Sequence, residues 1–356
     1  MKKINLLVIS VMALFLLTGV TQAQVFMVVS GGENPVSTPY DDLETAVKQA
    51  EAGSTVYIPR GEHLIKGSPV IAEDTRATTL LIDKKLNLIG AGAGEGTMHN
   101  SVINGNVTVT ADASGSVFEG VTFGLNYSYI LRLDNVSNFL LKRCLLPGNI
   151  YLSGKGDGNI IRECQVNMLY GYNSLYGYQG FSTDVSIFTK ILMQNCVVTS
   201  GIWYVREAII TNSVFTNYNP FTSIHYCTVS NNILTYNYVH STSSGASANN
   251  TFTYNLLVGT FTPTAGNLTE NNIESKSLFS IFGVASAPES VKYKLADDSP
   301  GIGAGNDGTD IGLYGSPAPA KEQRIPSTPS VTEFSVSGVS AADGKLPVKI
   351  TVEAQE

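Results

Sequence analysis

Leu141-Lys142-Arg143-Cys144-Leu145-Leu146 is one copy of a six-residue phrase that recurs through the middle of the chain. The phrase has apolar residues at its ends, two mostly polar residues after the first, and Gly, Cys, Ser or Asn at its fourth position. Eight copies begin at Val117, Leu141, Ile161, Met193, Ile210, Val229, Phe252 and Leu268. Their fourth positions are Gly120, Cys144, Cys164, Cys196, Ser213, Asn232, Asn255 and Asn271, at spacings of 24, 20, 32, 17, 19, 23 and 16 residues. Imperfect repeats of this length are typical of a solenoid.

Each copy is short and rich in Val, Ile, Leu, Thr and Asn, with no helical stripe extending from it, so it indicates strand. We interpret the phrase as a bend between two strands of one coil. Its fourth residue then points inward and stacks on its counterpart ~4.8 Å away in the next coil, and Asn residues there form ladders. The alternative is a sandwich of antiparallel hairpins, which would need several Asn-Gly or Asp-Gly turns. The repeat region has one such pair, Asp157-Gly158, so the sequence predicts an all-β parallel β-helix.

Composition limits the partners of the chain. Of its 356 residues, 43% are hydrophobic and 14% charged, and 22 Lys and Arg against 29 Asp and Glu give a net charge of −7. A solenoid of this length can bury a large core as one elongated unit. A charge-poor, negative chain disfavours a nucleic-acid partner, because such a partner requires a clustered basic face.

Residues 1–23 have the pattern of a secretory signal peptide: Lys2 and Lys3, an apolar run to Val20, and Thr21-Gln22-Ala23 as cleavage site. The apolar run is too short to favour a transmembrane segment, and no other stretch is long enough. We therefore expect a secreted protein that is periplasmic, extracellular or at the cell surface.

The β-helix domain is expected to span 24–315, with a short capping helix near 40–51. There Leu43, Ala46, Val47 and Ala50 follow the i, i+3, i+4, i+7 spacing, with acids in the first turn. Such a helix would cover the open strand edge at the end of the stack.

The chain is expected to end with a proline-rich linker over 316–330 and a β-hairpin over 331–356. Two strands alone are barely stable in water. We therefore expect the hairpin to dock on the β-helix or on a protein partner.

Two stretches resemble a known family. Gly53-Ser54-Thr55-Val56-Tyr57-Ile58-Pro59-Arg60-Gly61, followed by Leu88-Ile89-Gly90 and Val102-Ile103-Asn104-Gly105, resembles the opening coils of secreted proteins with the pectin-lyase-like right-handed parallel β-helix fold. Residues 295–305 and 309–315 are similar to the closing segment of many bacterial β-helix repeat proteins of that family. The resemblance covers residues 36–315 and implies the fold, which carries lyases, hydrolases, epimerases, adhesins and inert scaffolds.

Three of the four cysteines, Cys144, Cys164 and Cys196, share the fourth phrase position. Their expected spacing fits a disulfide, but three stacked thiols cannot all pair. Two interpretations are open: a disulfide, or buried thiols that act as small apolar side chains. The paired short spacings of a zinc site are absent from the sequence, and we expect no metal.

Charged groups for catalysis are few. A glycoside hydrolase needs two carboxyl groups, and a uronate lyase needs a base and a cation or Ca²⁺. Between residues 167 and 260 the charged residues are Asp184, Lys190, Arg206 and Glu207. Asp184, Arg206 and Glu207 are the candidate catalytic set, and surface residues on turns are the alternative.

A second charged set lies at matching phrase positions of adjacent coils. Arg143 and Glu163 should therefore be neighbours, and we expect them to form a surface ion pair of small energetic worth.

Aromatic residues are abundant where charge is scarce. Nine of 17 Tyr lie between residues 167 and 240, together with Trp203. The 32-residue spacing and the mixture of Tyr, Gly and Asn predict that residues 167–181 form a loop leaving the coil. Tyr and Trp suit stacking on sugar rings or a protein interface; the alternative is that half of them pack inside. The candidate binding residues are Tyr170, Tyr172, Tyr176, Tyr178, Trp203 and Tyr204.

The leading hypothesis is a secreted, non-catalytic or weakly catalytic protein that binds a polysaccharide or cell-surface glycan through this aromatic loop. One alternative is a polysaccharide lyase or glycoside hydrolase that uses Arg206 with Glu207 or Asp184, with Ca²⁺ as a cofactor only for a lyase. Another is a structural or adhesive surface protein whose terminal hairpin makes the contacts.

Overall fold

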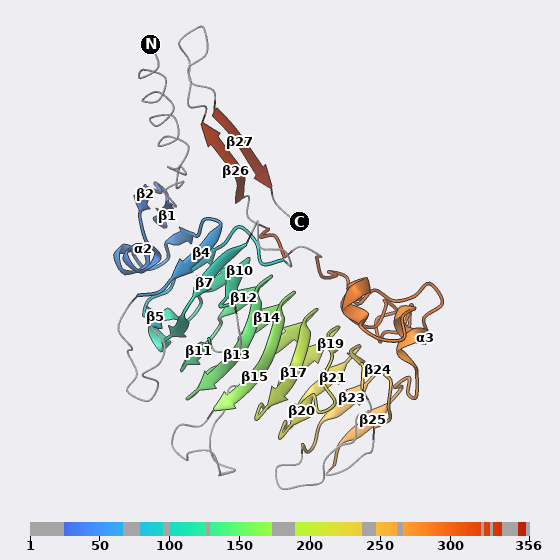
Figure 1. Ribbon diagram of the computed structural model, residues 1–356. Coiled ribbons are helices and arrows are strands. Elements are labelled where there is room, and N and C mark those ends of the chain that lie inside the picture. The colour runs from blue at the N-terminus through green and yellow to red at the C-terminus, as the bar shows by residue number, and fades with distance from the viewer. Residues whose placement is uncertain are drawn as a thin grey trace, which may run out of the picture.

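The protein is described by a computed structural model over residues 25–66, 79–94, 100–125, 129–172, 189–236, 247–261, 266–321, 324–327, 330–336 and 348–353. The chain winds as a right-handed parallel β-helix whose coils add strands to two long sheets (Figure 1). The predicted fold class is confirmed. The predicted signal peptide, residues 1–23, lies outside the described residues.

The first sheet, sheet A, has 12 strands in the described part of the chain, most of them three residues long. Only β1 pairs antiparallel, with β2 on one side and β3 on the other, and every later pairing is parallel. In spatial order the strands are β2 (Ser37–Tyr40), β1 (Phe26–Val29), β3 (Thr55–Tyr57), β6 (Asn87–Ile89), β9 (Val117–Glu119), β12 (Leu140–Lys142), β14 (Ile160–Arg162), β16 (Leu192–Gln194), β18 (Ile209–Thr211), β21 (Thr228–Ser230), β23 (Thr251–Thr253) and β25 (Leu268–Glu270).

The second sheet, sheet B, has 13 described strands, and it is widest in the middle of the stack, where β13, β15 and β17 run for nine, eight and seven residues. The strands are β4 (Gly61–Leu64), β5 (Thr79–Ile82), β7 (Ser101–Asn104), β8 (Asn106–Val109), β10 (Val121–Phe123), β11 (Leu131–Asp134), β13 (Leu145–Ser153), β15 (Gln165–Tyr172), β17 (Val197–Trp203), β19 (Val214–Phe215), β20 (Phe221–Thr222), β22 (Ile233–Leu234) and β24 (Leu256–Leu257).

The core lies between the two sheets. Successive side chains of a strand point to opposite faces, so the middle residue of each three-residue strand of sheet A points inward. The inward residues of neighbouring strands stack on one another and are buried, among them Phe118, Leu141, Ile161, Met193 and Ile210. The apolar first residue of the repeated phrase is therefore a core residue.

The fourth phrase position forms a buried hydrogen-bonded column, as predicted. Along it, each side chain accepts a hydrogen bond from the backbone N–H at the same position of the preceding coil. The Cys144 N–H donates to Cys164 Sγ (3.4 Å), the Cys196 N–H to Ser213 Oγ (3.1 Å), the Ser213 N–H to Asn232 Oδ1 (2.9 Å) and the Asn232 N–H to Asn255 Oδ1 (3.0 Å). The column satisfies backbone donors at a corner where the sheet pairing is interrupted.

For the first and last copies of the phrase, the alignment predicted from the sequence differs by one residue from the strand pairing in the structure. The strand pairing aligns Gly120 with Arg143, which occupies the third position of its copy. The residue that points inward in this coil is therefore Val121. In the last copy the inward residue is Asn272, whose Oδ1 accepts from the Asn255 N–H (2.9 Å). The third position has φ near +50° to +66° in each coil, which Gly and Asn adopt readily. Because Gly and Asn suit both positions, the pattern alone does not fix the alignment.

Helices cover both ends of the stack. Helix α2 (Leu43–Gln49) begins at Asp42, whose Oδ1 accepts from the Thr45 N–H at 2.7 Å, and it buries Leu43, Ala46 and Val47. The capping helix expected near 40–51 is therefore confirmed. At the other end α3 (Leu278–Phe282) packs on the last strands of sheet B, and the short 3-10 helices are η2 (Ala111–Ala113) and η3 (Pro288–Val291).

The C-terminal strands β26 (Ser330–Val336) and β27 (Val348–Glu353) pair antiparallel, as the predicted hairpin requires. Among the described residues, no helix is long and apolar enough to span a membrane.

Candidate functional site

Three aromatic side chains occupy directly paired positions on the long strands of sheet B. Tyr151 of β13 pairs with Tyr170 of β15, and Tyr170 pairs with Trp203 of β17. The preceding residues Ile150 and Leu169, like Ile202, are buried in the core. Alternation along each strand therefore turns the three rings to the outer face, where each is partly exposed. We call Tyr151, Tyr170 and Trp203 the aromatic row.

The rings of the aromatic row contact one another in tilted arrangements. The centroids of Tyr151 and Tyr170 are 5.5 Å apart with 61° between the ring planes, and those of Tyr170 and Trp203 are 6.1 Å apart with 50° between the planes. Tyr204, at a corner with φ of 58°, adds an edge contact with Tyr170 at 5.2 Å. These are the separations at which aromatic pairs attract, so the row is a fixed surface rather than a set of independent side chains.

A polar row lies beside the aromatic row on the same strands. Asn149 Nδ2 donates to the Tyr151 hydroxyl (3.2 Å), and Asn167 Nδ2 donates to Asn149 Oδ1 (2.9 Å). Asn167 Oδ1 accepts from Thr199 Oγ1 (3.1 Å) and Ser200 Oγ (2.6 Å). Asn167 stands where the strand register shifts, a bulge that is a frequent way to re-aim a side chain. The polar row thus presents neutral amides and hydroxyls along the stack.

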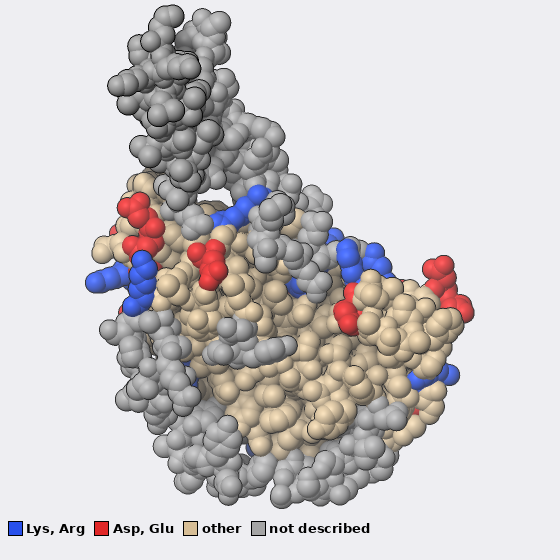
Figure 2. All heavy atoms as spheres, viewed as in Figure 1, with Lys and Arg blue, Asp and Glu red and all other residues tan. Residues whose placement is uncertain are grey.

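Two donors at this face have no hydrogen-bond partner. The indole nitrogen Nε1 of Trp203 is buried without an acceptor, and so is Nε of Arg132. Arg132 pairs with Tyr151 in the strand register and therefore continues the line of the aromatic row. Few charged side chains are visible on the face of the molecule drawn in Figure 2, and those gather mainly around its rim. A buried donor without an acceptor costs free energy.

The structure brings together some of the predicted site residues. Tyr170, Trp203 and Tyr204 lie side by side. Tyr172 ends strand β15 and pairs with Ser153 of β13. Tyr176, Tyr178 and Asp184 lie outside the described residues.

Two of the predicted charged residues, Arg206 and Glu207, lie on another side of the coil. Arg206 lies beyond the corner at Tyr204, with its guanidinium carbon 5.2 Å from the ring centre of Tyr226. Its neighbour in the next coil is His225, whose pKa is lowered first by burial and then by the positive charge of Arg206. Glu207 is exposed at the following corner. The described structure shows no ion pair between Arg206 and Glu207.

The prediction that residues 167–181 form a loop is wrong for 167–172, which belong to strand β15. Met168, Leu169 and Tyr170 pair with β13 on one side and β17 on the other, and this pairing outweighs the low strand propensity of the Gly and Asn neighbours. Sequence reasoning also missed Tyr151, although it precedes Tyr170 by one coil and alternates with Ile150 and Leu152.

A second polar cluster lies where the chain returns over the corner of the coils. Residues 306–321 and 324–327, the returning segment, run from the coil of Asn231 back to the coil of Glu119. Asn195 Nδ2 donates to the Leu313 carbonyl (2.8 Å), and Ser327 donates to Glu119 Oε1 through both N–H (2.9 Å) and Oγ (2.8 Å). Half of this segment, residues 316–321 and 324–327, falls in the stretch 316–330 that we predicted to be a linker.

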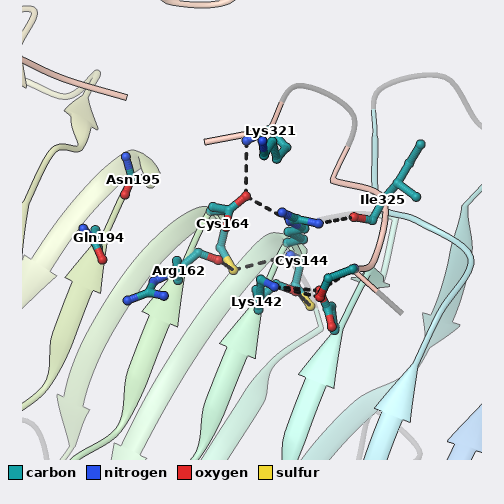
Figure 3. A network of polar contacts seen from close by, with 12 residues as sticks. Lys142, Cys144, Arg162, Cys164, Gln194, Asn195, Lys321 and Ile325 are labelled. Atoms are coloured by element: carbon teal, nitrogen blue, oxygen red, sulfur yellow. Dashed lines mark hydrogen bonds and ion pairs between the residues drawn. The ribbon is translucent and has the colours of Figure 1, made fainter. Parts of the chain in front are cut away.

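The returning segment covers the ion pair of Arg143 and Glu163. Arg143 Nε lies 2.9 Å from Glu163 Oε2, and the two side chains are only 3% and 6% exposed. Arg143 also donates to the Ile325 carbonyl (2.9 Å), and Glu163 accepts from the Lys321 N–H (3.2 Å). Figure 3 shows Lys321 and Ile325 above the strand ends that carry this pair. The expectation of a surface ion pair was wrong, because segments about 160 residues later in the chain exclude water from it.

The four cysteines are buried free thiols, which decides between the two interpretations of their column. Cys164 and Cys196 donate to the Arg162 (3.1 Å) and Gln194 (3.2 Å) carbonyls. Burial raises the pKa of both thiols well above the ordinary value, and burial raises the pKa of Cys227 to about 11. Within the described residues, no group of three or more His, Cys, Asp or Glu is arranged to hold a metal ion.

No family model matches the sequence, and no curated protein is similar to it at a significant level. Among solved structures, the catalytic domain of a GH87 alpha-1,3-glucanase in complex with nigerose aligns over 64% of this chain and 67% of its own, with 10% identity and a TM-score of 0.27. Two variants of that catalytic domain, also in complex with nigerose, align over the same shares with 11% identity and a TM-score of 0.28. Similarity at this level assigns neither a family nor an activity.

Proposed function

We propose that this protein binds a linear glycan along the aromatic row. The observation that carries the proposal is the placement of Tyr151, Tyr170 and Trp203 at paired positions of three adjacent strands, with all three rings partly exposed. A row of this kind runs parallel to the axis of the stack. A chain of sugar rings laid along that axis can place an apolar face against each aromatic ring in turn.

The polar groups beside the row suit the hydroxyls of a sugar. The Trp203 indole N–H needs an acceptor, and the amides of Asn149 and Asn167 offer both donors and acceptors. Ligand sites commonly combine apolar and aromatic surface with a few placed polar groups of this sort. In the proposal, the rings supply contact area and the polar row fixes the position of the glycan along the stack.

Binding is a better match to this face than hydrolysis. Hydrolysis of a glycosidic bond uses two carboxyl groups across the bond, whereas in the described residues of strands β5, β8, β11, β13, β15, β17 and β20 the only carboxylate is Asp134. The signal-peptide pattern of residues 1–23 supports a location outside the cytoplasm, where the protein can contact extracellular polysaccharides. The proposed role is therefore that of an exported glycan-binding protein.

Affinity electrophoresis in gels containing individual soluble polysaccharides tests the proposal. We expect Trp203→Ala and Tyr170→Ala to weaken retardation at least about tenfold, the factor that corresponds to 1.4 kcal/mol. Tyr218→Ala is the matched control, because Tyr218 is 72% exposed and lies outside the aromatic row. Equal retardation of all variants would refute the proposed site. Release of reducing ends or unsaturated products, with or without Ca²⁺, would identify a hydrolase or lyase instead.

A further inference from the structure

The charge pattern around the aromatic row points to the kind of glycan that it takes. Resting on the proposed function, we propose that the ligand carries one acidic group, a carboxylate or sulfate bound by Arg132, and that the sugar units lying over the aromatic row are neutral. The argument has two parts, one on the arginine at the end of the row and one on the strands beyond it.

Arg132 is placed to receive an anion at one end of the row. It lies on β11 in register with Tyr151, so Arg132, Tyr151, Tyr170 and Trp203 follow one line across four adjacent strands. Its side chain is partly exposed, and its Nε is buried with no acceptor. In the described part of the chain, the Arg132 guanidinium takes part in no hydrogen bond or ion pair. A guanidinium presents a planar fork of donors that matches a carboxylate or sulfate with two parallel hydrogen bonds.

Beyond Arg132, the described strands that carry the row place no cation beside it. The described residues of β13, β15, β17 and β20 include no Lys, Arg, His, Asp or Glu. An acidic group on each sugar unit would be desolvated against uncharged rings without a compensating cation, which is unfavourable. Asp134, two residues after Arg132 on the same strand, repels any acid at this end of the row, so only an acid held directly by the Arg132 guanidinium is expected there. The face therefore favours a glycan with a single charge at the Arg132 end.

Immobilised oligosaccharides in three sets of matched length test this inference. One set is neutral, one has a single acidic group at one terminus, as either carboxylate or sulfate, and one is acidic at every unit. We expect the wild-type protein to bind the singly acidic set on the order of tenfold more tightly than the other two, since a hydrogen bond to a charged group has about that worth. The carboxylate and sulfate arms identify which oxyanion is bound.

Three variants localise the effect. Arg132→Gln should reduce binding of the singly acidic set to the level of the neutral set, and Arg132→Lys, which keeps the charge but not the fork, should lie between. Arg162→Gln is the control, because Arg162 is also a partly exposed arginine whose buried Nε lacks a partner, but it lies on sheet A. Unchanged thermal midpoints show that each variant is folded.

The outcomes separate this inference from the proposed function. Equal binding of neutral and singly acidic sets, with Arg132→Gln unaltered, overturns the inference and leaves the proposed function standing. Tightest binding of the fully acidic set also overturns the inference. Absence of binding to all three sets, or binding that Trp203→Ala does not lower in any set, overturns the proposed function and the inference with it.

Discussion

Asn255 is the residue at which the stability of the stack can be tested most directly. It is fully buried, and its Oδ1 accepts from the Asn232 N–H (3.0 Å) and from Asn232 Nδ2 (3.1 Å). Its Nδ2 donates to the carbonyls of Val229 (2.9 Å) and Thr253 (3.1 Å) and to Asn272 Oδ1 (3.0 Å). One side chain therefore connects three successive coils.

Asn255→Ala removes all of these hydrogen bonds and leaves the buried Asn232 N–H without an acceptor. An unsatisfied buried donor costs about 1–3 kcal/mol, and each lost hydrogen bond about 1 kcal/mol. Hydrogen bonds that share one side chain are not additive, so the total is smaller than the sum of the single values. We therefore expect a loss of about 3–4 kcal/mol in the free energy of unfolding. Asn255→Ser should lose about half as much, because Ser213 shows in the same column that a serine hydroxyl accepts the backbone N–H of the preceding coil (3.1 Å) and donates to the Thr211 carbonyl (2.9 Å).

Urea unfolding monitored by circular dichroism and by the fluorescence of Trp203 measures these differences. Asn271→Gly is the control: it removes an exposed Asn in the next coil at a φ of 55°, a conformation that glycine adopts freely. We expect this change to cost less than about 1 kcal/mol. If the Ala and Ser variants were equally stable, or if the Ala variant lost no more than the control, the column would not be a source of stability.

Three further predictions concern the corner of the coils and the thiols. Glu163→Ala should destabilise the protein by about 3 kcal/mol in urea unfolding, because it removes the carboxylate that neutralises the buried guanidinium of Arg143. Lys190→Ala breaks an ion pair whose side chains are 69% and 51% exposed, so it should cost less than about 1 kcal/mol; similar losses would contradict the burial of the first pair. Gly120→Ala places a Cβ against the ring of Pro326 in the returning segment. Gly308 has a similar positive φ, but a Cβ there meets nothing within 4 Å, so Gly308→Ala is the control. Only the first variant should speed tryptic cleavage of the returning segment, and equal cleavage rates would argue against its docking. The native thiols should not react with an aromatic disulfide reagent at pH 8, because all four are buried, and burial raises the pKa of Cys227 to about 11 and the pKa values of Cys164 and Cys196 well above their ordinary value. Reaction of Cys227 should begin near pH 11 or on unfolding, and rapid reaction of the folded protein at pH 8 would show that the thiols are open to solvent.

The repeated phrase predicted the architecture because it encodes local events that recur in each coil. An apolar residue in the middle of one strand points into the core, the third position adopts a positive φ, and a small residue points inward at the fourth. The alignment of the end copies failed for a physical reason. Gly120 and Asn271 suit the left-handed conformation as well as the inward bend, and only the strand pairing distinguishes the two positions.

The candidate site was only partly predictable. Tyr170, Trp203 and Tyr204 were identified from composition, but their arrangement depends on strand register, which fixes Tyr151 as the first ring of the row. The burial of Arg143 and Glu163 had no local signal. The segment that covers them lies about 160 residues later, and its path over the corner follows from tertiary contacts such as the Lys321 N–H on Glu163.

The position of the aromatic row follows from the widths of the coils. A strand of two residues, as in β19 or β22, offers one outward position at most, whereas the long strands β13, β15 and β17 each offer several in register. The long strands of these middle coils therefore have room for both an aromatic row and a parallel polar row. With strands about 4.8 Å apart, the outer two strands of the row are separated by about 10 Å, so the surface suits a short stretch of a longer chain. Since Arg132 precedes the row and β20 follows it with Thr222, the two ends of that surface differ chemically, and a ligand bound along it has a defined direction.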